Sequence, residues 1–157
     1  MAVVIIDGRV AVDWCTAIAT LASPTTSELN AGTRLETFIT PDGLTINPTT
    51  APVDVSNLGS KYTWKRAGRV DIAVKIKFHH DGSTDTAWNL FPYRTNGFLA
   101  VRRGIDRTTA FASTQQVECY PLESAEPDQI DPAPNTNWDF TIDFFLTGDP
   151  VTRAVIA

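Results

Sequence analysis

The chain has 157 residues, of which 43% are hydrophobic and 10% aromatic, so it is long and apolar enough to fold as one domain around its own core. Its formal net charge is −5 and its pI is near 4.9. Because binding to nucleic acid through its phosphates needs clustered Lys and Arg, this balance argues against a nucleic-acid-binding protein. The basic residues are dispersed, and the small groups Arg102–Arg103 and Lys61, Lys65 and Arg66 are interpreted as parts of solvated faces.

No secretory signal and no membrane-spanning helix are expected. The opening MAVVIIDGRVAV has no basic region and places Asp7 within the apolar run, unlike a signal peptide. No apolar run approaches the ~20 residues that a membrane helix needs. Cys15 and Cys119 lack a zinc-binding spacing and indicate free thiols, although one disulfide between them stays an alternative. The chain is therefore expected to be soluble and cytosolic where it is made.

Turn signals recur at short intervals along the chain, among them Asp7-Gly8, Asp81-Gly82 and Asn96-Gly97. Between them lie short runs rich in Val, Ile, Thr, Phe and Tyr, a rhythm typical of an all-β sandwich or barrel. The expected strands cover residues 3–12, 34–40, 61–65, 69–79, 97–103, 115–120 and 137–147, with a short last strand over 151–156.

Helical signals are few. In SPTTSELNAG, Thr25 and Glu28 form a capping-box pattern and Gly32 marks the end of a helix of about two turns. A second short helix is expected over Asp85 to Phe91. Two stretches are predicted to be loops, Asn47 to Ser60, which is rich in Pro, Thr, Ser and Asn, and Pro121 to Asn137, which is rich in Pro and acids.

Two long stretches alternate between apolar and polar residues, as strands with one buried face do. In WDFTIDFFLT the apolar set is Trp138, Phe140, Ile142, Phe144 and Leu146, and the polar set is Asp139, Thr141 and Asp143. In VDIAVKIKFH the apolar set is Val70, Ile72, Val74, Ile76 and Phe78, and the other is Asp71, Ala73, Lys75, Lys77 and His79. These two strands are expected to carry the sheet, with Trp138 in the core.

The sequence offers no catalytic constellation. The motifs of nucleophile elbows, phosphate-binding loops and dinucleotide sites are absent. Neighbouring His79 and His80 would point to opposite faces of a strand, which disfavours a shared metal ion, and Cys119 lies in an alternating strand where a core position is favoured. Asp139 and Asp143 would be about 13 Å apart, too far for a glycosidase pair. We therefore predict no enzyme, no catalytic residue, no metal and no cofactor.

Several stretches carry a resemblance to a known family. They are TSELNAGTRLETFITPDGL, VDVSNLGSKY, DTAWNLFPYRTNGFLAVRRG and VECYPLE. In this order and spacing they resemble the tail tube (major tail) proteins of long-tailed, non-contractile (siphovirus-type) bacteriophages, closest to those of phages that infect actinobacteria. The resemblance covers about Trp14 to Thr147, no single motif is diagnostic, and the N-terminal dozen residues match least well.

The resemblance implies a β-sandwich with a short flanking helix, and six subunits per ring, with the rings stacked into a hollow tube that carries the genome to the cell. The implied partners are further copies of the chain and the tail tip, tape measure and tail terminator proteins. The genome DNA would pass through without specific binding. The implied location is the virion tail, after synthesis and assembly in the host cytoplasm. Residues 1–157 would form one tail tube domain.

On this basis, edge strands of neighbouring subunits are expected to pair into an inner barrel. The acidic strand face would then look into the channel, so that DNA meets like charge and slides. The residues expected there are Asp139, Thr141, Asp143, Gln116 and Glu118. Alternatively, the polar faces are simply wet outer surfaces.

Contacts between subunits are expected from three further sets of residues. Lys75 and Lys77 would pair with acids of a neighbour, although they might equally face the channel or lie outside it. The N-terminal arm, residues 1–12 with Val3, Val4, Ile5 and Ile6, would dock as an added strand on a neighbour. The loops 47–60 and 121–137 would join one ring to the next, since contacts that do not close generate filaments.

Other functions stay open at this point. A monomeric β-sandwich module could bind carbohydrate through exposed aromatics such as Tyr93 or Trp64, and a hydrolase with acidic catalysis is a weaker alternative. A head-tail joining or tail terminator protein of the same fold would form a single ring and stop.

Overall fold

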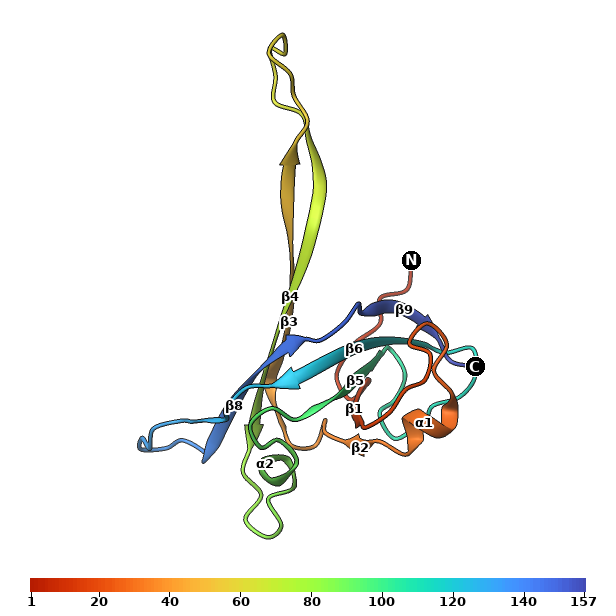
Figure 1. The fold of residues 1–157 in the computed structure, drawn as a ribbon. Coiled ribbons are helices and arrows are strands. Elements are labelled where there is room, and N and C mark those ends of the chain that lie inside the picture. The colour runs from red at the N-terminus through yellow and green to blue at the C-terminus, as the bar shows by residue number, and fades with distance from the viewer.

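The computed structural model describes residues 1–157 as nine strands and two short helices (Figure 1). The strands are β1 (Val10–Cys15), β2 (Thr33–Arg34), β3 (Ile39–Asp54), β4 (Lys65–His79), β5 (Asn96–Arg103), β6 (Gln116–Ser124), β7 (Asp128–Gln129), β8 (Asp139–Leu146) and β9 (Val151–Val155), and the helices are α1 (Thr26–Asn30) and α2 (Thr86–Leu90). The all-β prediction is confirmed. Neither helix is long and apolar enough to cross a membrane.

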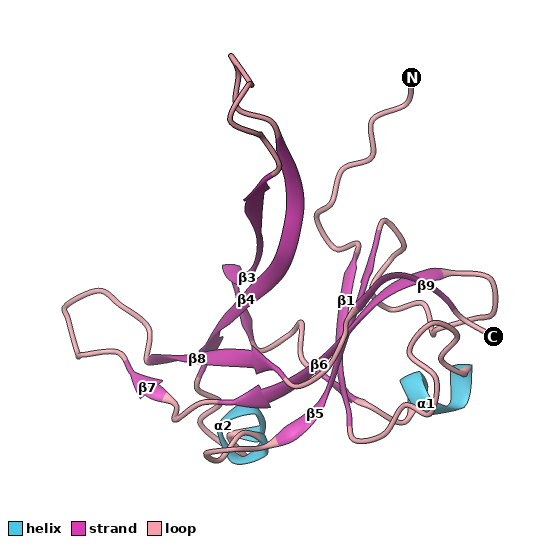
Figure 2. Cartoon of the chain, turned by 45° about the horizontal axis from the view of Figure 1, so that its top comes forward, coloured by secondary structure: helices cyan, strands magenta, loops and turns pink.

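All nine strands belong to one antiparallel sheet with the order β2-β1-β5-β6-β8-β4-β3, to which β7 adds on β8 and β9 on β6. Figure 2 shows how this sheet curves, with α1 and α2 lying at separate places along it. The curvature lets alternate side chains of one sheet form two different cores.

The larger core lies on one face of the sheet and is rich in aromatic residues. It contains alternate residues of β1, β5, β6, β8 and β4, together with Leu35 and, from the α2 region, Ala87 and Phe91. Trp14 packs edge-on against Phe91, with ring centroids 4.9 Å apart, and Phe91 packs edge-on against Phe144 at 5.2 Å. The short helix α2, which the sequence predicted, therefore closes this core.

The smaller core is formed by side chains on the opposite face of β1, β5 and β6. Ala11, Cys15, Ala100, Val117 and Cys119 face it, and Ile18, Leu29 of α1, Phe111, Ala154 and Ile156 cover it. Both cysteines are free and buried here. The predicted capping box also holds, because the Thr25 hydroxyl accepts the amide of Glu28 and the Glu28 carboxylate accepts the amide of Thr25.

The prediction of a loop over 47–60 is only partly right, since β3 runs on through Asp54 and pairs with β4 nearly to its end, and only residues 55–60 lie in no strand. Pro48 and Pro52 lie within β3, which is an edge strand of the sheet. Proline is tolerated there because the missing amide leaves no ladder bond unmade. The predicted strand 61–65 is also wrong, because β4 begins at Lys65 and continues unbroken to His79.

Three other boundaries differ from the predictions. Strand β1 begins at Val10, and residues 1–9 lie in no strand. The stretch 121–137 begins as the end of β6 and includes β7, so it is only partly loop. Trp138 precedes β8 and is 64% exposed, and it stacks on His80 with 3.9 Å between ring centroids, so its assignment to the core is wrong.

Candidate functional site

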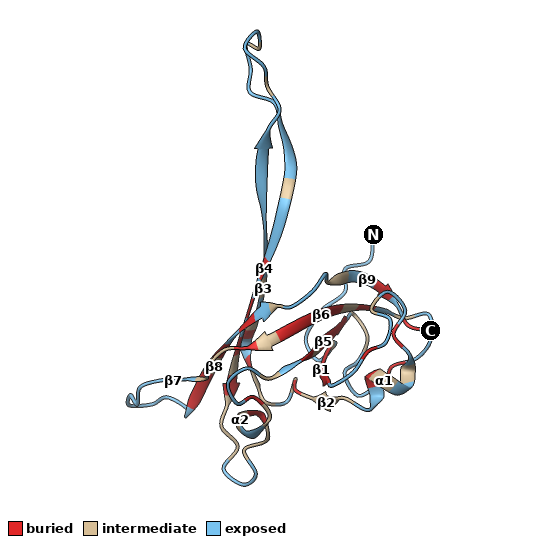
Figure 3. Cartoon of the chain, viewed as in Figure 1, coloured by how far each residue is buried: buried red, intermediate tan, exposed pale blue.

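The β3–β4 hairpin leaves the body of the protein as a free two-stranded ribbon (Figure 1). No residue between Asn47 and Asp71 is buried, and Figure 3 shows the distal ribbon exposed along almost its whole length. A two-stranded ribbon without a covering layer is marginally stable in water, because neither face is removed from solvent. Such a ribbon is a surface that a partner would complete.

The hairpin separates from the rest of the sheet at Phe144. Strand β8 pairs with β4 as far as Val74, opposite Phe144, and then pairs with β6 from Ser124 to Leu122. Beyond this fork, the edge of β4 that faced β8 has no partner strand, and β3 has none along its outer edge. A groove of about 390 Å³ lies at the fork. Unpaired edges of this kind are templates for pairing with another chain.

The distal part of the hairpin is basic and carries apolar side chains in solvent. Lys61, Lys65, Arg66 and Arg69 are all exposed and make no ion pair within the chain. Asp54 is the acid of this region, and its pKa is lowered because the backbone amide of Ser56 donates to its carboxylate. The exposed apolar residues are Val53, Val55, Leu58, Tyr62, Trp64 and Val70.

The outer face of β8 and β4 is polar, but its charges cancel within the chain. Lys77 Nζ lies 3.4 Å from Asp139 Oδ2, and Lys75 Nζ lies 4.0 Å from Asp143 Oδ1. Asp139 also contacts His79, with 2.6 Å between Oδ1 and Nδ1, and is only 7% exposed. Both lysines therefore contact acids of their own chain, and their predicted pairing with acids of a neighbour stays a prediction. Asp139 is not the free acidic group that the alternation suggested.

Gln116 and Glu118 do not share the face of Asp139 and Asp143. In β6, Leu122 lies opposite Leu146, and Glu123 lies opposite Phe145. Because facing residues of paired strands point to the same side, even-numbered positions of β6 share the aromatic-core face of β8 and not its polar face. Glu118 accepts hydrogen bonds from Arg103 Nε and the Tyr120 hydroxyl, each at 3.0 Å. The predicted grouping of these four polar residues is wrong.

The N-terminal arm is an apolar segment with little support from the body. Val3, Val4, Ile5 and Ile6 are 86%, 59%, 72% and 48% exposed. The first backbone hydrogen bond runs from the amide of Arg9 to the carbonyl of Ile6, and residues 1–5 make none. Four consecutive β-branched residues without a strand partner form a second surface that another chain could complete.

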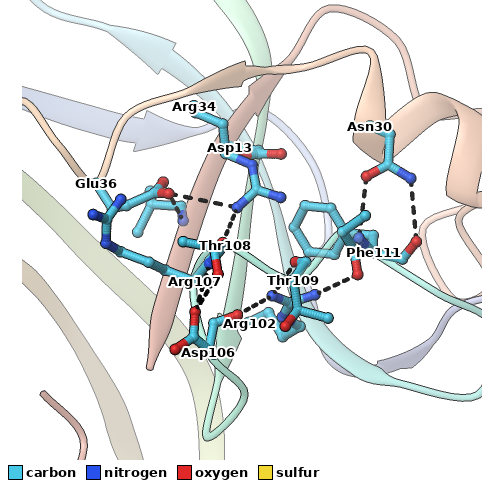
Figure 4. A network of polar contacts seen from close by, with 12 residues as sticks. Asp13, Asn30, Arg34, Glu36, Arg102, Asp106, Arg107, Thr108, Thr109 and Phe111 are labelled. Atoms are coloured by element: carbon cyan, nitrogen blue, oxygen red, sulfur yellow. Dashed lines mark hydrogen bonds and ion pairs between the residues drawn. The ribbon is translucent and has the colours of Figure 1, made fainter. Parts of the chain in front are cut away.

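A buried polar network holds the loop between β5 and β6 (Figure 4). Arg102 is fully buried, and its guanidinium donates to the carbonyls of Asp106, Thr109 and Ala110 and to the side chain of Gln115. Burial lowers the pKa of Arg102. Because each of these bonds fixes one point of the loop, the network shapes that loop and offers no free reactive group.

Asp13 lies beside this network and is 1% exposed. Its Oδ1 lies 3.0 Å from Arg34 Nε, and Arg34 also donates to the carbonyl of Arg107 at 2.7 Å. Burial raises the pKa of Asp13 to about 6, an effect that the charge of Arg34 only partly opposes. The residue was not singled out by sequence reasoning, because Asp13 in VAVDWC resembles any polar member of an alternating strand.

The two histidines serve different elements. His80 Nδ1 lies 2.7 Å from Asp85 Oδ2, and its Nε2 lies 3.1 Å from Gln129 Oε1. His79 contacts Asp139 instead. No group of three or more His, Cys, Asp or Glu side chains is placed to hold a metal ion. The histidines join strands and loops to one another.

Together, the free hairpin, the open strand edges and the exposed apolar arm define a building block of an assembly. A scan against protein-family models matches residues 1–157, the whole chain, to the family described as phage tail tube protein. A search of the curated proteins finds no match. The chain belongs to the phage tail tube protein family, which makes it a structural protein of the phage tail that assembles with itself into a tube.

Proposed function

We propose that this chain is the major tube subunit of a long-tailed, non-contractile phage tail, akin to those of actinobacterial phages. Six copies close a ring, and rings stack into a hollow tube that conducts the genome into the host. The observation that carries the proposal is the β3–β4 hairpin, which extends from the body with no buried residue between Asn47 and Asp71. Because the family assembles into a tube, we infer that this ribbon supplies part of the surface that subunits share.

Ring closure uses the open edges of the sheet. The outer edge of β3 and the edge of β4 beyond Val74 each present unpaired amides and carbonyls. Pairing an edge of one subunit with an edge of the next satisfies these groups and extends the sheet around the ring. The fork at Phe144 frees the hairpin from its own body for this pairing.

The channel wall is formed by the polar face of β8 and β4. Thr141 and Asp143 lie on this face, and Asp139 is part of it through its contacts with Lys77 and His79. Because acids and lysines pair there, the wall carries little net charge, and DNA finds no basic cluster on which its phosphates would bind. Reversing Asp143 to Lys is expected to leave the tubes intact and to slow DNA ejection, and unchanged ejection would contradict this placement.

The remaining contacts join the tube to itself and to the rest of the tail. The N-terminal arm docks on a neighbouring copy, and the hairpin end with the segment around β7 joins adjacent rings. Subunits are made and assembled in the host cytoplasm, starting from the tail tip around the tape measure protein and ending at the terminator. The genome then passes through without specific binding.

Negative-stain electron microscopy of the concentrated protein, beside virions, tests this function. Hollow tubes with a regular axial repeat are the expected result. Single rings that never stack would instead support a head-tail joining or tail terminator role for the same fold. A protein that stays monomeric and is missing from the tail shaft of virions would overturn the proposal.

A further inference from the structure

Charge is strongly segregated along this chain. Six of the 13 Lys and Arg residues lie between Lys61 and Lys77, where Asp71 is the only acid. Residues 108–152 contain eight Asp and Glu and neither Lys nor Arg. The first segment is the hairpin end with β4, and the second runs from the loop before β6 to β9. A net charge of −5 therefore hides one basic and one acidic region.

Ion pairs within the chain leave one cluster of free charges in each region, while Asp71 and Asp149 lie apart as single exposed and unpaired acids. On the basic side, Lys61, Lys65, Arg66 and Arg69 lack an ion-pair partner. On the acidic side, four acids are paired with Arg94, Arg103, Lys75, Lys77 or His79. The exposed and unpaired acids beside and within β7 are Glu126, Asp128 and Asp131.

Apolar side chains accompany the free charges on both surfaces. Leu58, Tyr62 and Trp64 are 107%, 78% and 58% exposed at the hairpin end. Beside the acids, Ile130 is 38% exposed and Trp138 is 64% exposed. An apolar centre bordered by charged residues is the usual composition of a protein interface, so the two surfaces match in apolar character as well as in charge.

The two surfaces do not meet in one chain. The hairpin and the β7 segment extend from the body in different directions in both ribbon views (Figures 1 and 2), and no ion pair joins them. A second copy of the chain, which the family's self-assembly supplies, is therefore the partner that the charges fit.

We propose that the basic hairpin end, residues 58–69, docks on the acidic β7 segment, residues 126–131, of a copy in the adjacent ring. The inference rests on the proposed tube function and names the acceptor of its hairpin. Each copy offers one hairpin and one acidic segment, so the contact is head-to-tail and repeats from ring to ring without closing. Opposite charge also orients the rings, since inverted stacking would bring like charges together.

A charge swap in the full-length chain tests the proposal. The basic variant carries Lys61→Glu, Arg66→Glu and Arg69→Glu, and the acidic variant carries Glu126→Lys, Asp128→Lys and Asp131→Lys. Lys65 is kept because it lies opposite Asp54 in the ribbon, and an acidic side chain in its place would be repelled by Asp54. Each variant alone is expected to lower the yield of pelletable tubes at least about tenfold. Both sets in one chain are expected to restore the tubes.

The control reverses two other exposed and unpaired residues that lie outside the proposed contacts, as Arg107→Glu and Arg153→Glu. It changes the net charge in the same direction as the basic variant and is expected to keep the tubes. If the two variants assemble like wild type, or if the combined chain stays unassembled, the docking inference is overturned while wild-type tubes still support the proposed function. A combined chain that stays unassembled would favour a polyanion such as DNA as the partner of the hairpin.

Cross-linking gives an independent readout. Both native cysteines are buried, so Tyr62→Cys with Ile130→Cys adds the only accessible thiols. Oxidised tubes of this variant are expected to give a ladder of covalent oligomers on a non-reducing gel, because every copy is linked at both ends. Tyr62→Cys paired with Arg153→Cys is the control. No ladder from the first pair, or the same ladder from both, would contradict the proposed contact.

Discussion

Lys77 Nζ lies 3.4 Å from Asp139 Oδ2 on the outer face of the sheet, and the two residues come from adjacent strands, β4 and β8. Two strands that look like separate acidic and basic patterns in the sequence thus neutralise each other once they pair. The register decides this, because it brings His79 opposite Asp139 and Lys75 opposite Asp143. The polar face of β4 and β8 therefore carries little net charge.

The two acids of this face are expected to contribute unequally to stability. Asp139→Asn removes a buried carboxylate that contacts both Lys77 and His79, and we expect it to lower the free energy of unfolding by about 1–2 kcal/mol. Asp143→Asn breaks an exposed pair at 4.0 Å and should change it by less than ~0.5 kcal/mol. Urea unfolding of both variants measures this, and equal effects would contradict the difference in burial.

A glycine on β5 fits closely against the aromatic core. A Cβ at Gly97 would lie 2.6 Å from the Trp14 ring, which is itself held by Phe91 and Phe144. Gly97→Ala is therefore expected to destabilise the fold by about 1–3 kcal/mol, as overpacked cores do. Gly82→Ala is the matched control, since nothing lies within 4 Å of its Cβ and its effect should be small. Thermal unfolding of the two variants compares them directly.

Local patterns were sufficient to predict much of the fold. Alternation located β4 and β8, and the Thr25–Glu28 capping box located α1. Local reasoning failed where a distant pairing overrides composition. Pro48 and Pro52 indicated a loop, yet both lie on an edge strand where proline costs no ladder bond. Whether a stretch is an edge strand depends on the whole sheet, which no window of the sequence reveals.

The candidate site was harder to predict, for a related reason. Alternation predicts correctly which side chains of β8 share a face, but it does not show that Gln116 and Glu118 lie on the other face, which only the register between β6 and β8 reveals. The sequence alone predicts a solvated face for the loose basic group around Lys61. The docking role that we propose for this group rests on the projecting ribbon that carries it and on the free acids near β7. Both are properties of the three-dimensional structure.

Stability is expected to depend on pH through Asp13. Burial raises its pKa to about 6 in the folded chain, above its ordinary value of 3.8, so the folded state binds this proton more tightly than the unfolded state. The contribution of Asp13 is therefore most favourable below about pH 4 and is lost as the pH rises through 6. Relative to wild type, Asp13→Asn should gain up to about 3 kcal/mol between pH 4 and pH 7.

Urea unfolding of wild type and Asp13→Asn at several pH values measures this difference. The attraction of Arg34 is already part of the folded pKa of Asp13, and effects of the substitution that do not depend on pH shift the variant's profile by a constant amount, so the shape of the difference carries the result. Parallel profiles from pH 4 to 7 would show that the carboxyl of Asp13 titrates normally in the folded protein.

The two cysteines are expected to be inert in the folded chain. Burial raises the pKa of Cys15 to about 12 and that of Cys119 to about 11, so very little thiolate exists at pH 8. Alkylation by iodoacetamide should be at least about a hundredfold slower than in the unfolded chain. Arg153→Cys supplies an exposed thiol as the internal control, and fast modification of either native cysteine would contradict this placement in the core.

The N-terminal arm is expected to matter for assembly and not for folding. Residues 1–5 make no backbone hydrogen bond, and Val3, Val4 and Ile5 are mostly exposed, so removing residues 1–5 should leave the thermal midpoint of the monomer within about 1 °C. The same deletion should sharply lower the yield of tubes. Sedimentation followed by electron microscopy gives that yield.

A point variant separates loss of apolar contact from loss of chain length. Replacing Val3, Val4 and Ile5 with Ser keeps the backbone that would pair with a neighbour but removes the side chains that would fill its surface. If the arm docks as an added strand, this variant should assemble poorly, as the deletion does. Normal tubes from the serine variant but not from the deletion would mean that the arm contributes through its backbone alone, and normal tubes from both would exclude it from the interface.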